Sequence, residues 1–235
     1  MTTSTDKSAH VQAMFSRIVR RYDLMNRVMT LGRDQAWRRL TARELHLDGA
    51  APLVLDLATG TGDIALAIAR AYPSARVIAL DFARPMLDAA QDKSFRQGAP
   101  VRDFAQGDAL RLPFADAVFD ALTNGFLLRN VADLRQALAE MRRVVKPGGQ
   151  VACLEITRPG APIFRDAFRL YFYGLVPRIG RLVSGDPQAY TYLPHSLTHF
   201  PRASELSQMM LEVGFRDVRF RLLGLGAMAL HIATV

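Results

Sequence analysis

A glycine-rich turn between an apolar strand and a helix is the feature that most constrains this fold. Residues 53–58 are short and apolar, which predicts a strand buried on both faces. The strand runs into Thr59-Gly60-Thr61-Gly62, and residues 64–71 then show the apolar spacing of a helix. Glycines let a ligand approach the backbone closely, and the first turn of a helix offers free N–H groups. We therefore expect a ligand site at the carboxyl end of this strand.

The rest of the chain continues the alternation of strand and helix. Helices are expected at residues 10–45 (broken at Gly32, with the second part from residue 34), 85–91, 131–145 and 203–213. Strands are expected at residues 76–80, 101–106, 119–124, 151–156, 218–222 and 228–234. Lys146-Pro147-Gly148-Gly149 is interpreted as a helix stop followed by a turn. This order predicts a doubly wound α/β domain with seven strands, the last two forming an antiparallel hairpin at the sheet edge.

We interpret the chain as one domain with four regions. Residues 1–46 form N-terminal helices, 47–157 the ligand-binding core, 158–200 a cap, and 201–235 a closing helix and hairpin. The cap is aromatic and basic, and its aromatic residues fit either an apolar tunnel for a ligand or ordinary core packing.

Charge and cysteine usage exclude several classes of protein. The net charge is +8, and the basic excess lies in residues 1–46 and 158–235 around a near-neutral centre. Such flanks either attract an anionic surface or are simply solvated. The single cysteine, Cys153, excludes a disulfide framework, and no cluster has the spacing of metal ligands. With no signal peptide or spanning segment in the pattern, we expect a cytoplasmic protein without a metal.

The residues that follow the strands indicate the ligand. Asp81 ends the second strand, where a carboxylate can accept both hydroxyls of a ribose. The spacing of Gly60, Gly62 and Ala65 also fits a dinucleotide site, so NAD and a methyl donor both remain open at this point. Asp56 inside the first strand and Asp108 after the third, together with the terminal hairpin, favour S-adenosylmethionine.

Three motifs resemble those of a known family. They are Tyr22-Asp23-Leu24-Met25-Asn26, Leu128-Arg129-Asn130-Val131, and the segment from Arg143 through Gly149 to Glu155. Over roughly residues 12–232 the chain resembles the menaquinone/ubiquinone biosynthesis C-methyltransferase family. It departs from the family pattern at Thr30, Asp34, Thr59 and Leu127.

The resemblance implies a class I methyltransferase with a Rossmann-like fold, using S-adenosylmethionine to methylate a ring carbon of a reduced polyprenyl quinone. Demethylmenaquinol is the expected substrate, with a ubiquinone precursor or another lipid or phenolic acceptor as alternatives. The predicted cofactor-binding residues are Asp56, Gly60, Thr61, Gly62, Asp81, Asp108, Ala109 and Gly125.

Two residues are the catalytic candidates. A phenol has a pKa near 10, so a fixed cation that stabilises the phenolate would help the ring carbon to react. Arg129 is assigned that role, and the resemblance implies that it acts with a water; the alternative is a structural arginine. Tyr22 either binds the ring oxygen, seals the cofactor or only packs. His195 and His199 are either proton carriers or surface and packing residues.

A polyprenylated quinol partitions into membranes, so we expect reversible peripheral membrane contact and no nucleic-acid partner. The oligomeric state is left open, with a homodimer as one alternative. The rival interpretations are an NAD-dependent oxidoreductase and a basic RNA- or membrane-binding module without catalysis.

Overall fold

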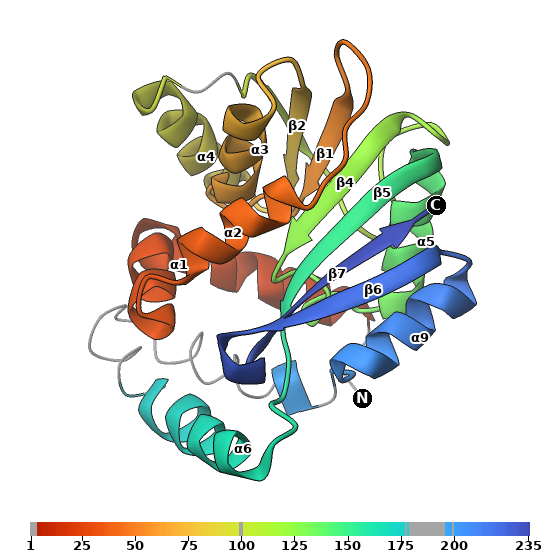
Figure 1. The fold of residues 1–235 in the computed structure, drawn as a ribbon. Coiled ribbons are helices and arrows are strands. Elements are labelled where there is room, and N and C mark those ends of the chain that lie inside the picture. The colour runs from red at the N-terminus through yellow and green to blue at the C-terminus, as the bar shows by residue number, and fades with distance from the viewer. Residues whose placement is uncertain (1–3, 99–100, 177, 179–195, 199) are drawn as a thin grey trace.

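The strands form one twisted sheet in the order β3-β2-β1-β4-β5-β7-β6 (Figure 1). The computed structural model describes residues 4–98, 101–176, 178, 196–198 and 200–235. In this part of the chain the strands are β1 (Leu53–Leu57), β2 (Arg76–Asp81), β3 (Asp103–Gln106), β4 (Phe119–Gly125), β5 (Val145–Ile156), β6 (Arg216–Leu223) and β7 (Met228–Thr234). Neighbours from β3 to β5 pair in parallel, whereas β7 is antiparallel to both β5 and β6. The predicted seven-stranded sheet with an antiparallel terminal hairpin is confirmed.

Helices cover both faces of the sheet. They are α1 (Ser4–Thr30), α2 (Asp34–Arg43), α3 (Asp63–Ala71), α4 (Arg84–Arg96), α5 (Leu134–Val144), α6 (Pro162–Arg169) and α9 (Ala203–Val213), with a π-helical segment at Leu170–Leu175 and a short 3₁₀ helix at Gly224–Gly226. Side chains alternate along β1, so Leu55 and Leu57 pack in the core shared with α5 and α9, while Val54 packs with α2 and α3. Each such side chain contributes about 1.5–3 kcal/mol when fully buried.

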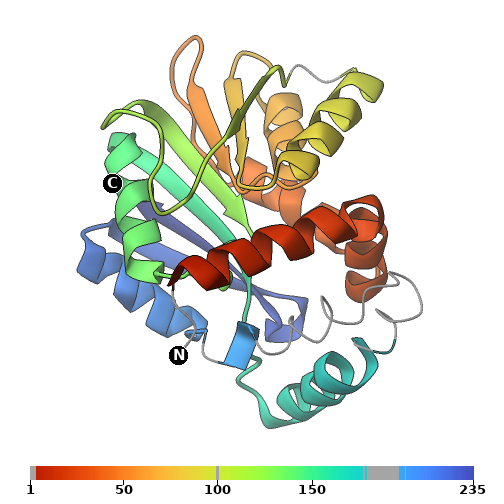
Figure 2. The ribbon, with the colours of Figure 1, turned by 180° about the vertical axis from the view of Figure 1, so that it is seen from behind.

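Helix α1 lies across the carboxyl ends of the parallel strands (Figure 2). Gln12 Nε2 donates to the carbonyl oxygen of Phe82, which follows β2, over 2.9 Å. The chain then turns at Gly32, whose φ of 74° is in the left-handed region that glycine tolerates, and α2 begins at Asp34. The predicted break between the two N-terminal helices is therefore confirmed.

Two predicted boundaries around α5 differ from the structure. The helix begins at Leu134 rather than residue 131, because the side chain of Asp133 accepts a hydrogen bond from Gln136 N and caps it. The predicted helix stop is confirmed, since α5 ends at Val144, but residues 146–149 form an irregular part of β5 rather than a separate turn: its pairing with β4 shifts from Phe119–Val145 to Ala121–Gln150. Gly149 lets β5 approach β4 there, because a Cβ at this position would lie 2.6 Å from Asp120 O.

The cap region begins with α6 and the π-helical segment. Phe168 stacks on Phe172 with ring centroids 4.9 Å apart, and the Tyr171 hydroxyl donates to Met29 O in α1 over 2.7 Å. His195 and His199 lie outside the described residues. Within the described ranges, none of the helices combines the length and the apolar character needed to cross a membrane.

Candidate functional site

The side chain of Asp56, in β1, stabilises the glycine loop that follows this strand. This carboxylate accepts hydrogen bonds from Thr59 Oγ1 (2.6 Å), Ala65 N (3.1 Å) and Thr123 Oγ1 (2.6 Å). Burial raises its pKa to about 6, against the opposing effect of these donors. Asp56 thus ties β1, the loop, α3 and β4 together, and its predicted contact with the cofactor stays a prediction.

Gly60 and Gly62 give the loop its shape. Their φ angles of 56° and 84° are both left-handed, a conformation that other residues adopt only with strain. A Cβ at Gly62 would lie 3.1 Å from Ala90 Cβ, so this glycine also lets α4 approach the loop. The loop thus turns tightly into the start of α3, and its predicted contact with a ligand stays a prediction.

Asp81 lies at the end of β2, beside this loop. Its Oδ2 accepts from Gly60 N over 2.8 Å and its Oδ1 from Ala83 N over 2.9 Å. Burial raises its pKa, while the N–H groups of Ala83, Gly60 and Phe82 act in the opposite direction. A carboxylate offers about four acceptor positions, so capacity for hydroxyl donors remains. The carboxyl group thus fits the ribose contact that the sequence predicts.

Three further predicted cofactor residues lie along the same edge of the sheet. Asp108 follows β3, and its Oδ1 accepts from Leu110 N over 2.9 Å. Ala109 is buried in the core beside it, and Gly125 ends β4. A Cβ at Gly125 would lie 2.7 Å from Ile64 Cδ1, so a side chain there would collide with α3. The structure brings all of these positions to the carboxyl ends of β1 to β4.

Thr61 takes part in a polar network that fastens α1 to the loop. Its hydroxyl donates to Asp23 Oδ1 over 2.6 Å and accepts from Lys93 Nζ over 2.9 Å. Lys93 also pairs with Asp23 at 2.5 Å and with Asp63, the first residue of α3, at 2.9 Å. Burial acts to raise the pKa of Asp63, but Arg38 and Lys93 together outweigh burial and lower it. The side chain of Thr61 is therefore engaged within the protein.

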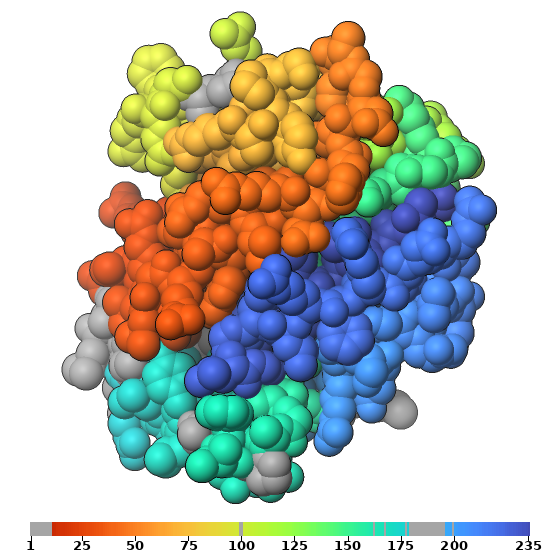
Figure 3. Space-filling model, viewed as in Figure 1, coloured from red at the N-terminus to blue at the C-terminus, as the bar shows by residue number. Residues whose placement is uncertain are grey.

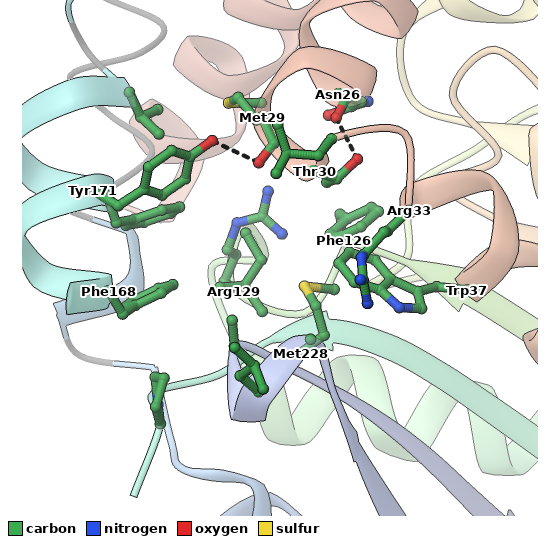
Figure 4. Close-up of a pocket in the computed structure, with 18 of the residues that line it drawn as sticks. Asn26, Met29, Thr30, Arg33, Trp37, Phe126, Arg129, Phe168, Tyr171 and Met228 are labelled. Atoms are coloured by element: carbon green, nitrogen blue, oxygen red, sulfur yellow. Dashed lines mark hydrogen bonds between the residues drawn. The ribbon is translucent and has the colours of Figure 1, made fainter. Parts of the chain in front are cut away.

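An apolar pocket of about 560 Å³ opens beside the loop (Figure 4). Its wall comes from α1, α2, the β4–α5 connection, the end of β5, the cap helices and the β6–β7 connection. The lining includes Phe15, Ile18, Tyr22, Asn26, Met29, Trp37, Phe126, Arg129, Asn130, Phe168, Tyr171, Phe172 and Met228. The size and character suit a large hydrophobic ligand with a few polar groups.

Arg129 supplies a buried cation to the wall of this pocket. Its Nη1 donates to the carboxylate of Glu155 at the end of β5, and its Cζ lies 5.5 Å from the centroid of the Phe126 ring. Its Nε has no hydrogen-bond partner among the described residues. The guanidinium is thus held in place with a donor left over, as a group that stabilises developing negative charge requires.

Tyr22 lies between the loop and the pocket. It lines the pocket, and a Cβ at Gly60 would lie 3.7 Å from Tyr22 Cε1. The two predicted catalytic residues, Tyr22 and Arg129, therefore line one cavity next to the glycine loop. Their roles in catalysis stay predictions.

Sequence reasoning missed several residues of the site. The sequence pattern assigns no role to Lys93, Glu155 or Phe126, yet Lys93 fixes the loop, and Glu155 and Phe126 contact Arg129. A charged residue at the end of an otherwise apolar strand, such as Glu155, is the signal that could have been used. Among the described residues, no group of three or more histidine, cysteine and acidic side chains could hold a metal ion.

Comparison with known proteins agrees with this geometry. Residues 1–235 match the ubiE/COQ5 methyltransferase family. A demethylmenaquinone methyltransferase from Deinococcus radiodurans is 49% identical over 221 residues, covering 94% of this chain and 90% of the relative. A demethylmenaquinone methyltransferase from Roseiflexus castenholzii is 47% identical, covering 96% and 93%.

A ubiquinone/menaquinone biosynthesis C-methyltransferase from Desulfotalea psychrophila is 44% identical, covering 96% of this chain and 90% of that protein. Among solved structures, a SAM-dependent methyltransferase from Thermotoga maritima is similar, with a TM-score of 0.65. It is 17% identical, and the match covers 95% of this chain and 98% of that one. At this identity the structural likeness bears on the fold alone.

Proposed function

Since the chain belongs to the ubiE/COQ5 methyltransferase family, we propose that it methylates a ring carbon of reduced demethylmenaquinone, with S-adenosylmethionine as methyl donor. The observation that carries this proposal is the position of one cavity. A large apolar pocket that contains the buried cation of Arg129 lies beside the glycine loop, and Tyr22 lines this pocket next to Gly60.

The residues at the strand ends fit the methyl donor. Asp81 retains acceptor capacity for ribose hydroxyls, and Asp108 and Ala109 stand where the base would lie. S-adenosylmethionine supplies, when bound, an electrophilic methyl group on a positively charged sulfur. An NAD-dependent oxidoreductase is not supported, because the family and the terminal hairpin are those of methyltransferases.

Arg129 would act on the acceptor. Loss of a hydroxyl proton raises the electron density at the neighbouring ring carbons, and the resulting phenolate is unfavourable at neutral pH because a free phenol has a pKa near 10. A guanidinium keeps its proton at all relevant pH values, so Arg129 serves as a fixed positive charge and not as a base. Glu155 holds the guanidinium in place, and the hydroxyl proton would pass to a water beside Arg129.

The rest of the pocket would take the fused ring and the start of the prenyl tail. Phe168, Tyr171 and Phe172 form part of its wall, and α1 is joined to that wall through the Tyr171–Met29 hydrogen bond. Such an apolar surface would bind a prenyl tail without selecting for the length of that tail.

We further propose that the mouth of the pocket rests on a membrane. Leu31 in the α1–α2 turn and Leu225 between β6 and β7 line the pocket, yet they are 86% and 72% exposed. Ile163 at the start of α6 is 77% exposed. The three segments lie at one end of the molecule (Figures 1 and 3). Exposed apolar side chains around the mouth of a lipid-sized cavity are the arrangement expected of a peripheral membrane contact.

Backbone conformation supports this docking surface. Leu31 and Leu225 have φ angles of 52° and 58°, a left-handed conformation that costs energy for a leucine. Arginines such as Arg33 and Arg169 are exposed near the same end, and each basic residue held near an anionic leaflet contributes about 1 kcal/mol.

The test of the function is an acceptor comparison. The purified protein is given S-adenosylmethionine with demethylmenaquinol, with the oxidised quinone, or with a benzoquinol precursor of ubiquinone. We expect methylation of demethylmenaquinol and none of the oxidised form, because only the quinol yields a phenolate. Turnover of the benzoquinol alone would assign the enzyme to the ubiquinone branch, and turnover of neither quinol would refute the proposal.

A further inference from the structure

One buried arginine remains outside the site described so far. Arg38, in α2, is only 4% exposed. Its Nη1 lies 3.7 Å from Asp63 Oδ2 and its Nε lies 3.7 Å from Asp34 Oδ2, so both ion pairs are longer than hydrogen bonds. Burial works against its charge, but Tyr22 and the nearby carboxylates outweigh burial and raise the pKa of Arg38. The guanidinium is therefore charged and enclosed.

Two donors of this guanidinium are unused. Neither Nε nor Nη2 has a hydrogen-bond partner within the described part of the chain. These two atoms form one edge of the guanidinium fork, the edge that binds a carboxylate side-on through two parallel hydrogen bonds. A buried donor left without a hydrogen bond is costly, and Asp34 is too far from Nε to supply one, so this pair of donors on a cation indicates that a closer anionic acceptor belongs there.

The contacts of Arg38 place it at one end of the cofactor site. Asp63 follows Gly62 directly at the start of α3, and Phe126 follows Gly125 at the end of β4. The Cζ of Arg38 lies 5.4 Å from the centroid of the Phe126 ring. The guanidinium thus stands between the glycine loop and the end of β4, next to the pocket that Phe126 lines.

Strand order gives the direction of the bound methyl donor. The sheet runs β3-β2-β1-β4, with Asp108 after β3 and Asp81 at the end of β2. If the base lies near Asp108 and the ribose near Asp81, the amino-acid part continues past β1 toward β4. That part carries an α-carboxylate, which is the anion that a guanidinium edge without hydrogen bonds fits.

We propose that Arg38 binds the α-carboxylate of S-adenosylmethionine through Nε and Nη2. This inference rests on the methyl-donor assignment above and adds a contact on α2, which also lines the substrate pocket through Trp37. The contact would fix the amino-acid end of the cofactor, so that the sulfur is directed to the side of the pocket where Arg129 lies.

The test compares two ligands that differ only in the carboxylate. S-adenosylhomocysteine and its decarboxylated analogue are titrated by calorimetry into the wild type, Arg38→Gln, Arg38→Lys and Arg39→Gln. Arg39 is the neighbouring exposed arginine of the same helix and serves as the matched control. The quantity compared is the ratio of the two affinities within each protein, which does not depend on the folded fraction.

We expect the wild type and Arg39→Gln to bind S-adenosylhomocysteine more tightly than the analogue. Hydrogen bonds to a charged group are worth enough that Arg38→Gln should lower this preference about 10- to 100-fold, with affinity for the analogue unchanged or higher. Arg38→Lys should retain part of the preference, since it keeps the charge without the fork. An equal loss of both ligands, or an unchanged ratio in Arg38→Gln, would overturn the proposal. If the wild type binds neither ligand, the methyl-donor assignment itself fails.

Discussion

Arg129 and Glu155 form a buried ion pair that joins the β4–α5 connection to the end of β5 on the wall of the apolar pocket. Glu155 is further fixed by accepting hydrogen bonds from Ile156 N (2.8 Å) and Arg129 N (3.4 Å). The carboxylate therefore sets the position of the cation, and the cation lines the pocket.

Replacing Arg129 separates catalysis from cofactor binding. If it stabilises charge that develops only during the reaction, Arg129→Ala should lower kcat by about 10²–10³-fold and leave the affinity for S-adenosylmethionine nearly unchanged. Steady-state kinetics and calorimetry measure the two quantities. Near-normal turnover in a folded variant would leave Arg129 with a structural role only.

Removing the partner of a buried charge should act mainly on stability. Glu155→Gln leaves the Arg129 guanidinium buried without a counter-charge, and breaking such a pair costs about 3–5 kcal/mol. Urea unfolding should show this loss. A variant as stable as the wild type would mean that the pair is compensated by other contacts.

The predicted ribose contact of Asp81 can be tested by measuring cofactor affinity, without an acceptor substrate. Asp81→Ala removes the acceptor for the ribose hydroxyls and should weaken S-adenosylmethionine binding by about 2 kcal/mol, because hydrogen bonds to a charged group are worth about 1.5–3 kcal/mol. Since Gly60 N also donates to this carboxylate, circular dichroism must show that the variant remains folded. Unchanged affinity in calorimetry would sink the assignment.

The buried carboxyl of Asp56 should make stability depend on pH. Its pKa is raised from 3.8 to about 6 in the folded protein, so between these values the folded state keeps a proton that the unfolded state has lost. Folding stability therefore falls as the pH rises from about 4 to about 6, by about 3 kcal/mol for this group, and is level above. Urea unfolding of the wild type and Asp56→Asn over this range should show their difference changing by that amount. Parallel curves would contradict the expectation.

If Leu31 and Leu225 form the membrane-docking surface, replacing them should impair activity only when the substrate is in a membrane. Asparagine tolerates the left-handed conformation, so the double variant Leu31→Asn, Leu225→Asn should fold while losing sedimentation with anionic vesicles. Its activity should fall on substrate embedded in vesicles and be retained on a short-tailed quinol in detergent. Phe95→Asn, an 87% exposed residue on α4, is the control and should change neither. Vesicle binding by the double variant equal to that of the wild type would contradict the proposed surface.

The sequence was sufficient for the fold because its signals are local. The apolar run of β1, the glycine turn and the break at Gly32 each follow from neighbouring residues, and all three are present in the structure. Residues 146–149 are part of β5 rather than a separate turn because Gly148 N donates to Val235 O and Gly149 O accepts from Val235 N, and no local pattern reveals contacts with so distant a residue.

The site was predictable only in part, for the same reason. Asp81 and Gly60 stand at strand ends and could be recognised from their position. Thr61 and Asp56 also stand there, but their side chains are engaged by Lys93, Thr59 and Thr123, which only the folded chain brings together. Arg38 gave no signal in the sequence, because its unpartnered donors exist only once α2 has packed on α3.

The most direct test of the central claim is the position of the transferred methyl group. The protein is incubated with demethylmenaquinol and S-adenosylmethionine that carries a ¹³C-labelled methyl group, and the extracted product is examined by NMR. We predict that the label appears as a methyl group on a ring carbon. A label found on oxygen as a methyl ether, or no label in the quinol at all, would contradict the account.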